Sequence, residues 1–201
     1  LICQCPIYFW GMASFQFPSQ TNLYHGKVRD VFCFACFTGL RYSDVMNLKR
    51  ENIVSDSIRF TTIKTQENKE IPLNHFAKNI LNKYVDDKKP LPAIASQDIN
   101  TDLENIGKDL KFNEPVKFVK YKGSERIETY VPMHEVLTFH VSRKTFVTTS
   151  LVLGMDERMV KEFSGHKKEE NFRRYVKFAD TYKTKVMNTI WNEKSIKKAQ
   201  K

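Results

Sequence analysis

Several features that would place this chain outside the globular class are absent from it. Only 7 glycines and 7 prolines occur in 201 residues, and there is no low-complexity tract and no internal repeat. No apolar run is long enough for a transmembrane span. The apolar start, residues 1–17, lacks a basic leader and is interrupted by polar residues and proline, so it is a poor signal peptide. We therefore expect a cytoplasmic protein.

Acidic residues are also comparatively few. The chain has 33 lysines and arginines against 23 acidic residues, a net charge of +10 and a pI near 9.4. Such an excess favours polyanionic partners, nucleic acid before a membrane surface. A merely solubilising surface is the alternative. The 41% hydrophobic content and the length predict one domain with a sizeable packed core.

Only four cysteines are present: Cys3, Cys5, Cys33 and Cys36. A C-x-C and a C-x-x-C can together make a tetrahedral zinc site. The second pair lies in an apolar stretch of helical period, where reduced cysteine is a small core residue. We favour the core interpretation and expect neither a metal nor a cofactor.

Hydrophobic periodicity predicts an α+β chain that is mainly α. Val28, Val31, Phe32, Ala35 and Cys36 follow the spacing of an amphipathic helix that ends at Thr38–Gly39. Further helices are expected at 44–49 (capped by Ser43), 74–87, 96–110, 141–153, 156–163, 168–176 and from 180 onward. Strands are expected at 52–54, 57–64 and 70–73, with 66–69 as a polar turn, and a hairpin at 115–131.

Six residues of suitable chemistry follow one another along the chain. They are Arg41, Lys64, His140, Arg143, His166 and Tyr175. The arginines could hold the two nonbridging oxygens of a phosphodiester as it becomes a phosphorane. Taken singly, each of the six is more often an ordinary surface or core residue. Their order and spacing favour a joint role.

The remaining residues of the set suggest a metal-free attack on phosphorus. Tyr175 would be the nucleophile, although its hydroxyl must be activated because its free pKa is about 10. His140 could exchange the tyrosine proton and His166 could donate to a phosphoryl oxygen. Lys64, at the end of a strand, could protonate the departing 5′-hydroxyl.

The same order of motifs resembles the tyrosine recombinases of the phage integrase family. The resemblance rests on TGLRYSD at 38–44, KT at 64–65 followed by IPL at 71–73, HVSR at 140–143, SGH at 164–166, and Tyr175 nine residues later. It covers residues 23–191. The sequence around the first arginine and the inserted hairpin most resemble those of integrases of conjugative transposons.

That resemblance implies a mostly helical catalytic domain with a small antiparallel three-stranded sheet and an extra β-hairpin. It implies site-specific cleavage and rejoining of double-stranded DNA through a 3′-phosphotyrosine, without metal or ATP, in a tetramer on DNA. In such a tetramer the C-terminal helix docks on a neighbour. The stripe of Val186, Met187, Ile190 and Trp191 would suit such docking, or would pack on its own domain.

One departure concerns the domain organisation. We expect residues 23–201 to form the catalytic domain and residues 1–22 to be a linker remnant, with the family's N-terminal core-binding domain absent. That departure keeps a second function open, a truncated relative that binds DNA without cleaving it. A type IB topoisomerase-like enzyme, which shares the chemistry, is a third.

Overall fold

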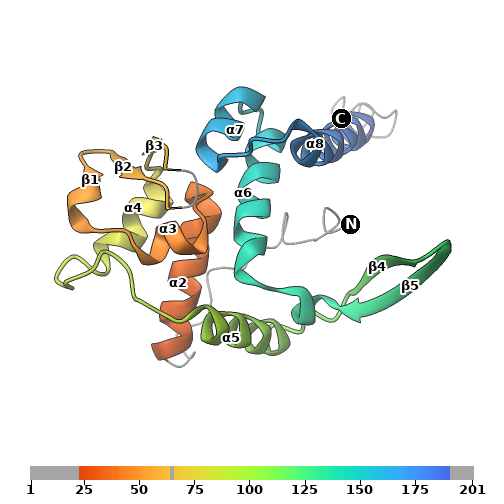
Figure 1. Ribbon diagram of the computed structural model, residues 1–201, viewed down its shortest axis with the longest axis horizontal. Helices are drawn as coiled ribbons and strands as arrows, with labels where there is room; N and C mark the ends of the chain where they lie inside the picture. The colour runs from red at the N-terminus through yellow and green to blue at the C-terminus, as the bar shows by residue number, and fades with distance from the viewer. Residues whose placement is uncertain (1–22, 64–65, 191–201) are drawn as a thin grey trace, which may run out of the picture.

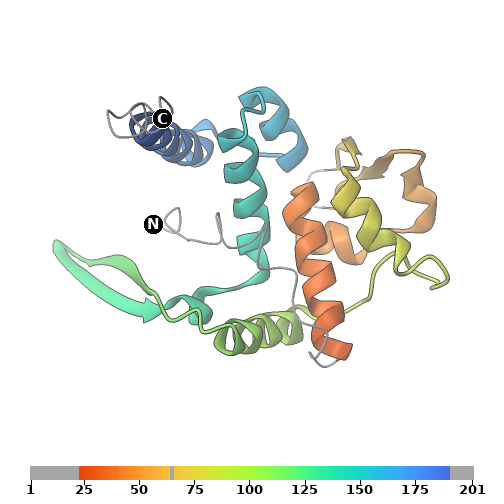
Figure 2. The ribbon, with the colours of Figure 1, turned by 180° about the vertical axis from the view of Figure 1, so that it is seen from behind.

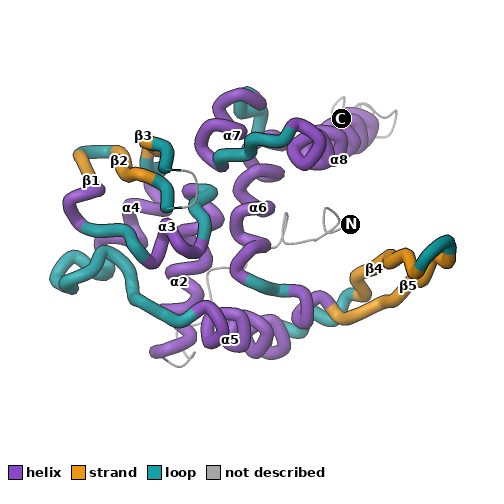
Figure 3. Tube along the Cα trace, viewed as in Figure 1, coloured by secondary structure: helices purple, strands orange, loops and turns teal. Residues whose placement is uncertain are grey.

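The computed structural model describes residues 23–63 and 66–190 of the chain, and helices make up most of this part (Figures 1 and 3). The helices are α2 (Leu23–Thr38), α3 (Tyr42–Met46), α4 (His75–Asn82), α5 (Ser96–Asp109), α6 (Phe139–Val152), α7 (Glu157–Ser164) and α8 (Glu169–Ile190), with the 3₁₀ turns η1 (Arg50–Asn52) and η2 (Met133–Val136). The strands are β1 (Ile53–Val54), β2 (Ser57–Thr61), β3 (Asn68–Pro72), β4 (Pro115–Lys122) and β5 (Glu125–Pro132). Within this part, no helix combines the length and apolarity that a bilayer span requires.

Helix α2 is the centre of the larger core, because α4, α5 and α6 all pack against it. Val28, Val31, Phe32 and Ala35 of the predicted stripe are at most 1% exposed. Phe34, outside that stripe, is also fully buried. The helix is therefore covered on more than one side, as an enclosed core helix should be.

The first sheet is antiparallel with strand order β1-β2-β3, which confirms the predicted three strands. Ile58 of β2 pairs with Ile71 of β3, and both face the core. The adjacent pair Arg59 and Glu70 faces outward and forms an ion pair of 3.0 Å. This alternation is the pattern of a sheet with one covered face. The turn between β2 and β3 carries residues 64–65, which lie outside the described part.

The second sheet is the predicted hairpin, in which β4 and β5 pair from Pro115–Pro132 out to Lys122–Glu125. Gly123 has a φ of 63°, the left-handed conformation that tight hairpin turns need. The hairpin projects from the end of the domain where α5 and α6 meet (Figures 1 and 2). Tyr121 and Tyr130 on it are 70% and 61% exposed.

Several predicted helix boundaries are wrong. Helix α4 ends at Asn82, five residues before the predicted end at 87, and α3 ends at Met46 instead of 49. Helix α3 begins at Tyr42 with Arg41 as the N-cap, so Ser43 lies inside the helix and does not cap it. Helix α8 runs unbroken from Glu169 to Ile190, although a break was expected between residues 176 and 180. Phe172 and Ala179 of α8 are both buried in a second core with α6 and α7, and this packing holds the helix through the expected break.

Candidate active site

The turn between α2 and α3 sets the position of Arg41. Gly39 has a φ of 71°, and a Cβ added there would lie 2.5 Å from the Phe146 ring. Glycine is therefore required both by the backbone conformation and by the packing of α6 against the turn. Arg41 follows in extended conformation at the N-cap of α3, so its side chain leaves the chain at a helix start.

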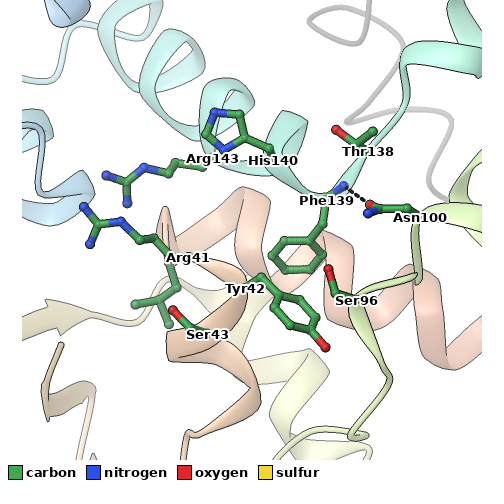
Figure 4. A pocket seen from close by; sticks show the side chains of 10 residues that line it. Arg41, Tyr42, Ser43, Ser96, Asn100, Thr138, Phe139, His140 and Arg143 are labelled. Carbon is green, nitrogen blue, oxygen red and sulfur yellow. Dashed lines mark hydrogen bonds between the residues drawn. The ribbon is translucent and has the colours of Figure 1, made fainter. Parts of the chain in front are cut away.

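A second arginine approaches the same point from α6. Arg143 is 7% exposed, and its Nη1 donates to the Gly39 carbonyl at 3.1 Å. Arg41 Nη2 donates to the Gly165 carbonyl at 3.2 Å. The two guanidinium groups lie side by side at one end of a cavity (Figure 4). Segments 104 and 124 residues apart are thereby joined at one place.

The paired cations need an anion. Burial, and next the charge of Arg41, lower the pKa of Arg143 to about 10, at which it is still protonated at neutral pH. Asp44 lies 4.0 Å from Arg41 and offsets part of the charge, but its other oxygen accepts from the Ile63 amide at 3.3 Å. The remaining positive potential suits a phosphate, which two forked guanidiniums can bind through several hydrogen bonds.

His140 lies one turn before Arg143 on α6 and lines the same cavity, which has a volume of about 600 Å³ (Figure 4). Burial, Lys144 and the two arginines lower the pKa of His140, which favours its neutral form. The far end of the cavity is lined by Ser96, Asn100 and Thr138.

His166 follows the C-terminus of α7. Gly165 caps this helix with a φ of 61°, and the His166 amide donates to the Lys161 carbonyl at 3.1 Å. The imidazole Nδ1 lies 2.8 Å from the Ser164 hydroxyl. Burial and then the two arginines are the main causes that lower the pKa of His166 to about 4.

Tyr175 reaches His166 from α8. The two ring centroids are 5.7 Å apart with an edge-to-face angle of 62°. The tyrosine is partly buried against the second core. The negative charge of its phenolate form raises the pKa of Arg143, so the phenol lies close enough to interact with that guanidinium. The structure thus brings five of the six predicted residues to one site.

The sixth predicted residue, Lys64, lies outside the described residues. A lysine that sequence reasoning missed does reach the site. Lys69 was assigned to a polar turn, but it belongs to β3, and its Nζ donates to the Glu162 carbonyl at the end of α7. A Cβ on Gly165 would be 2.9 Å from that Nζ. Burial, and next Arg143, lower the pKa of Lys69.

The pKa of His166 gives the first prediction, on stability against pH. The unfolded imidazole gains its proton near pH 6.5, but the folded one only near pH 4. Between these values the unfolded state binds more protons, so this contribution to stability is complete above about pH 6.5 and is lost as the pH falls to 4. We expect His166→Gln to remove on the order of 2 kcal/mol of the wild-type loss between pH 7 and 4.5.

Urea unfolding at the two pH values measures the difference. The matched control is His75→Gln, since His75 is an exposed histidine at the start of α4. An unchanged acid dependence in the His166 variant would show that the imidazole is not held neutral by its surroundings.

The described cysteines match the core interpretation. Cys33 is buried in α2, and its pKa is raised to about 12, mainly by burial. Cys36 is partly buried on the same helix, and burial raises its pKa well above its usual value. Both therefore remain protonated thiols at neutral pH. Cys3 and Cys5 lie outside the described residues.

Comparison with known proteins agrees with this geometry. The profile of the phage integrase family matches residues 20–181, so the chain belongs to that family. No curated protein sequence matches it significantly.

The chain is similar in structure to XerH site-specific recombinase bound to difH DNA, with a TM-score of 0.59, 14% identity, and coverage of 89% of this chain and 49% of that one. The Tn1549 transposon integrase in complex with circular intermediate DNA gives a TM-score of 0.51 and 15% identity, and the match covers 78% of this chain and 55% of that one. The catalytic domain of bacteriophage HP1 integrase gives a TM-score of 0.51 and 21% identity, and the match covers 82% of this chain and 81% of that one. The chain thus spans about half the length of the first two, and its fold is that of a tyrosine recombinase catalytic domain.

Proposed function

We propose that this chain is the catalytic domain of a site-specific DNA recombinase that cleaves and rejoins double-stranded DNA through a 3′-phosphotyrosine. The observation that carries the proposal is the meeting of Arg41 and Arg143 beside His166 and Tyr175. The buried Arg143 guanidinium and the partly buried Arg41 guanidinium provide an anion site, and the phenol next to it provides a nucleophile. A structural role alone would not require both at one point.

The proposed cleavage step is an in-line displacement at phosphorus. The Tyr175 oxygen forms a bond to phosphorus as the bond to the 5′-oxygen breaks, and the arginines stabilise the charge on the nonbridging oxygens. His140 is proposed to accept the tyrosine proton, and His166 to donate a hydrogen bond to a phosphoryl oxygen. Lys64 is proposed to give the 5′-oxygen its proton. The phosphotyrosine keeps the energy of the phosphodiester, so rejoining needs neither ATP nor metal.

The proposed partner is double-stranded DNA, to which a net charge of +10 is attracted through its phosphates. Assembly as a tetramer on two DNA sites is proposed by analogy with the family, in the cytoplasm, where that DNA would be. Met187 of the predicted docking stripe is 58% exposed. Trp191 lies outside the described residues.

Two alternative functions predict different results with DNA. A noncatalytic DNA-binding relative would bind duplex without joining to it. A type IB topoisomerase-like enzyme would relax supercoiled DNA of any sequence. Incubating the chain with nicked duplexes tests the proposal. A recombinase should form a covalent adduct only on duplexes that carry its recombination site. Adducts on every duplex would favour the topoisomerase, and binding without any adduct would favour the noncatalytic relative.

The role of Lys64 gives a prediction on the leaving group. Lys64→Ala should cleave ordinary DNA about 10²-fold or more slowly than the wild-type chain, because it lacks the general acid. On DNA with sulfur as the 5′-bridging atom it should recover, because a thiolate leaves without a proton. Single-turnover cleavage of the two substrates measures this.

Lys69→Ala is the matched control, because this lysine's ammonium already donates to the Glu162 carbonyl. Its defect should be equal on the oxygen and sulfur substrates. Should sulfur rescue Lys69→Ala and leave Lys64→Ala slow, the acid would be Lys69.

A further inference from the structure

We propose that Lys69 is a third cation of the phosphate site, and that its ammonium binds a nonbridging oxygen of the scissile phosphate beside Arg41 and Arg143. The identity of that phosphate rests on the proposed function. Lys69 lies on β3, the strand that follows the turn with Lys64. Lys64 keeps its proposed role as the acid for the 5′-oxygen, so the two lysines act on different oxygens of one phosphodiester.

The register of the first sheet turns the Lys69 side chain toward the interior. Successive residues of a strand face opposite sides of the sheet, so Lys69 shares its side with the buried Ile71. Its partner across the sheet is Phe60, which packs against the larger core. A charged side chain on a covered face is costly unless its charge is paired. The position of this lysine therefore needs an explanation.

From this face the ammonium extends to the end of α7 and to Arg41. Lys69 Nζ lies 2.9 Å, and Arg41 Nη2 lies 3.7 Å, from the position that a Cβ on Gly165 would occupy. Arg41 Nη2 also donates to the Gly165 carbonyl at 3.2 Å, which holds its guanidinium at the same residue. The lysine and arginine donors thus converge on Gly165, and the missing side chain gives them the space to do so.

The hydrogen bonding of Lys69 leaves donors for a ligand. An ammonium group has three N–H donors and no acceptor. Within residues 23–63 and 66–190, its only hydrogen bond is the one to the Glu162 carbonyl, and it forms no ion pair with a carboxylate. A phosphate oxygen can therefore accept from a second N–H while the bond to Glu162 is kept.

The charges around Lys69 favour an anion at this place. Burial is the main cause that lowers its pKa, and the charge of Arg143 is the next. Arg41 adds to the lowering, while Glu67 and Glu162 oppose it. Like charges held together in a partly buried place destabilise one another, and an anion among them reverses that effect. The oxygens of a phosphate offer acceptors to both guanidiniums and to the ammonium.

Lys167 shows what a structural contact looks like at the same junction. Its ammonium joins the loop after α7 to the turn before β3 through an ion pair of 2.8 Å with Glu67. The Lys167 side chain is 59% exposed, and the carboxylate matches its charge. Lys69 joins the same two segments, but it is partly buried and bonds to an uncharged carbonyl. An anchor alone would not require a positive charge there.

Inorganic phosphate tests the anion contact without DNA. The chain is titrated with sodium phosphate at constant ionic strength and neutral pH, and the ring signals of His140 and His166 report occupancy of the site by NMR. We expect Lys69→Met to raise the dissociation constant of phosphate about tenfold, the value of one charge-assisted hydrogen bond. Methionine keeps an apolar stem of similar length and removes the ammonium.

Lys167→Met is the matched control, because it removes an ammonium that joins the same two segments but is paired with Glu67. It should bind phosphate as the wild-type chain does. Lys69→Gln is a second variant, which retains an N–H donor for a carbonyl but has no charge, and it should lose as much affinity as Lys69→Met. Wild-type affinity in both Lys69 variants, or an equal loss in Lys167→Met, would overturn the inference.

Cleavage decides whether the contact serves the reaction. At saturating nicked duplex, Lys69→Met should cleave about tenfold more slowly than the wild-type chain. A methylphosphonate at the mapped cleavage position has a methyl group in place of one nonbridging oxygen and carries no charge, so it should abolish most of that difference. A difference of the same size on both duplexes would contradict a contact with the phosphate. If the wild-type chain forms no adduct on any duplex, the proposed function fails, and the phosphate titration still decides whether Lys69 binds the anion.

Discussion

Replacing Tyr175 by phenylalanine is expected to abolish covalent joining of the chain to a nicked suicide duplex. The substitution removes the hydroxyl that attacks phosphorus, and no other group among the described residues has the same position beside His166 and the arginines. The phenyl ring keeps the contacts of Tyr175 with the second core, so folding and DNA binding should be retained. Adduct yield after denaturing electrophoresis is the measurement.

Tyr182→Phe is the matched control because it makes the same change seven residues further along α8. It should give adducts at the wild-type yield. Adducts of normal yield from Tyr175→Phe would falsify the assignment of the nucleophile.

Replacing either Arg41 or Arg143 by alanine is expected to slow cleavage by about 10²-fold or more, because each stabilises negative charge that develops on the phosphoryl oxygens in the transition state. Lysine should restore little activity at either position, since an ammonium group cannot reproduce the planar fork of donors. For Arg143 the loss is expected to include some stability, because its Nη1 donates to the Gly39 carbonyl inside the domain.

Single-turnover cleavage rates at saturating DNA, together with unfolding curves, separate these effects. Arg59→Ala is the control, because this arginine lies on the surface of β2 in an ion pair with Glu70. Full activity of the double variant with lysine at positions 41 and 143 would rule out a clamp that depends on guanidinium geometry.

Much of the fold could be predicted because its signals are local. Alternation predicted strands at 57–64 and 70–73, which the structure has at 57–61 and 68–72, and Gly123 between two alternating runs marked the hairpin. Asn74 was recognised as a helix start, and its side chain does accept from the Ala77 amide. Patterns of this kind are decided within a few residues, so the sequence displays them.

The misplaced boundaries arose where tertiary packing overrides local preference. Ser43 is a better N-cap than Arg41 by intrinsic preference, yet the chain turns at Gly39 against Phe146, and the helix starts earlier. Similarly, burial of Phe172 and Ala179 carries α8 through a stretch that looked like two helices. Neither partner surface is visible in the local sequence.

The site shows the same division. The order of the predicted residues identified five side chains that the structure brings together, but their spacing contained no information on Lys69. Its role depends on β3 lying beside the end of α7, a contact across 93 residues between Lys69 and Glu162.

The chemical identity of the protein–DNA linkage tests the central claim most directly. The wild-type chain is incubated with a nicked suicide duplex in EDTA, and the adduct is digested and analysed by mass spectrometry. The account predicts a nucleotide joined through its 3′-phosphate to Tyr175, with a free 5′-hydroxyl on the released strand. Attachment to another residue, a 5′-phosphate linkage, or adducts that form only when magnesium is restored would contradict it.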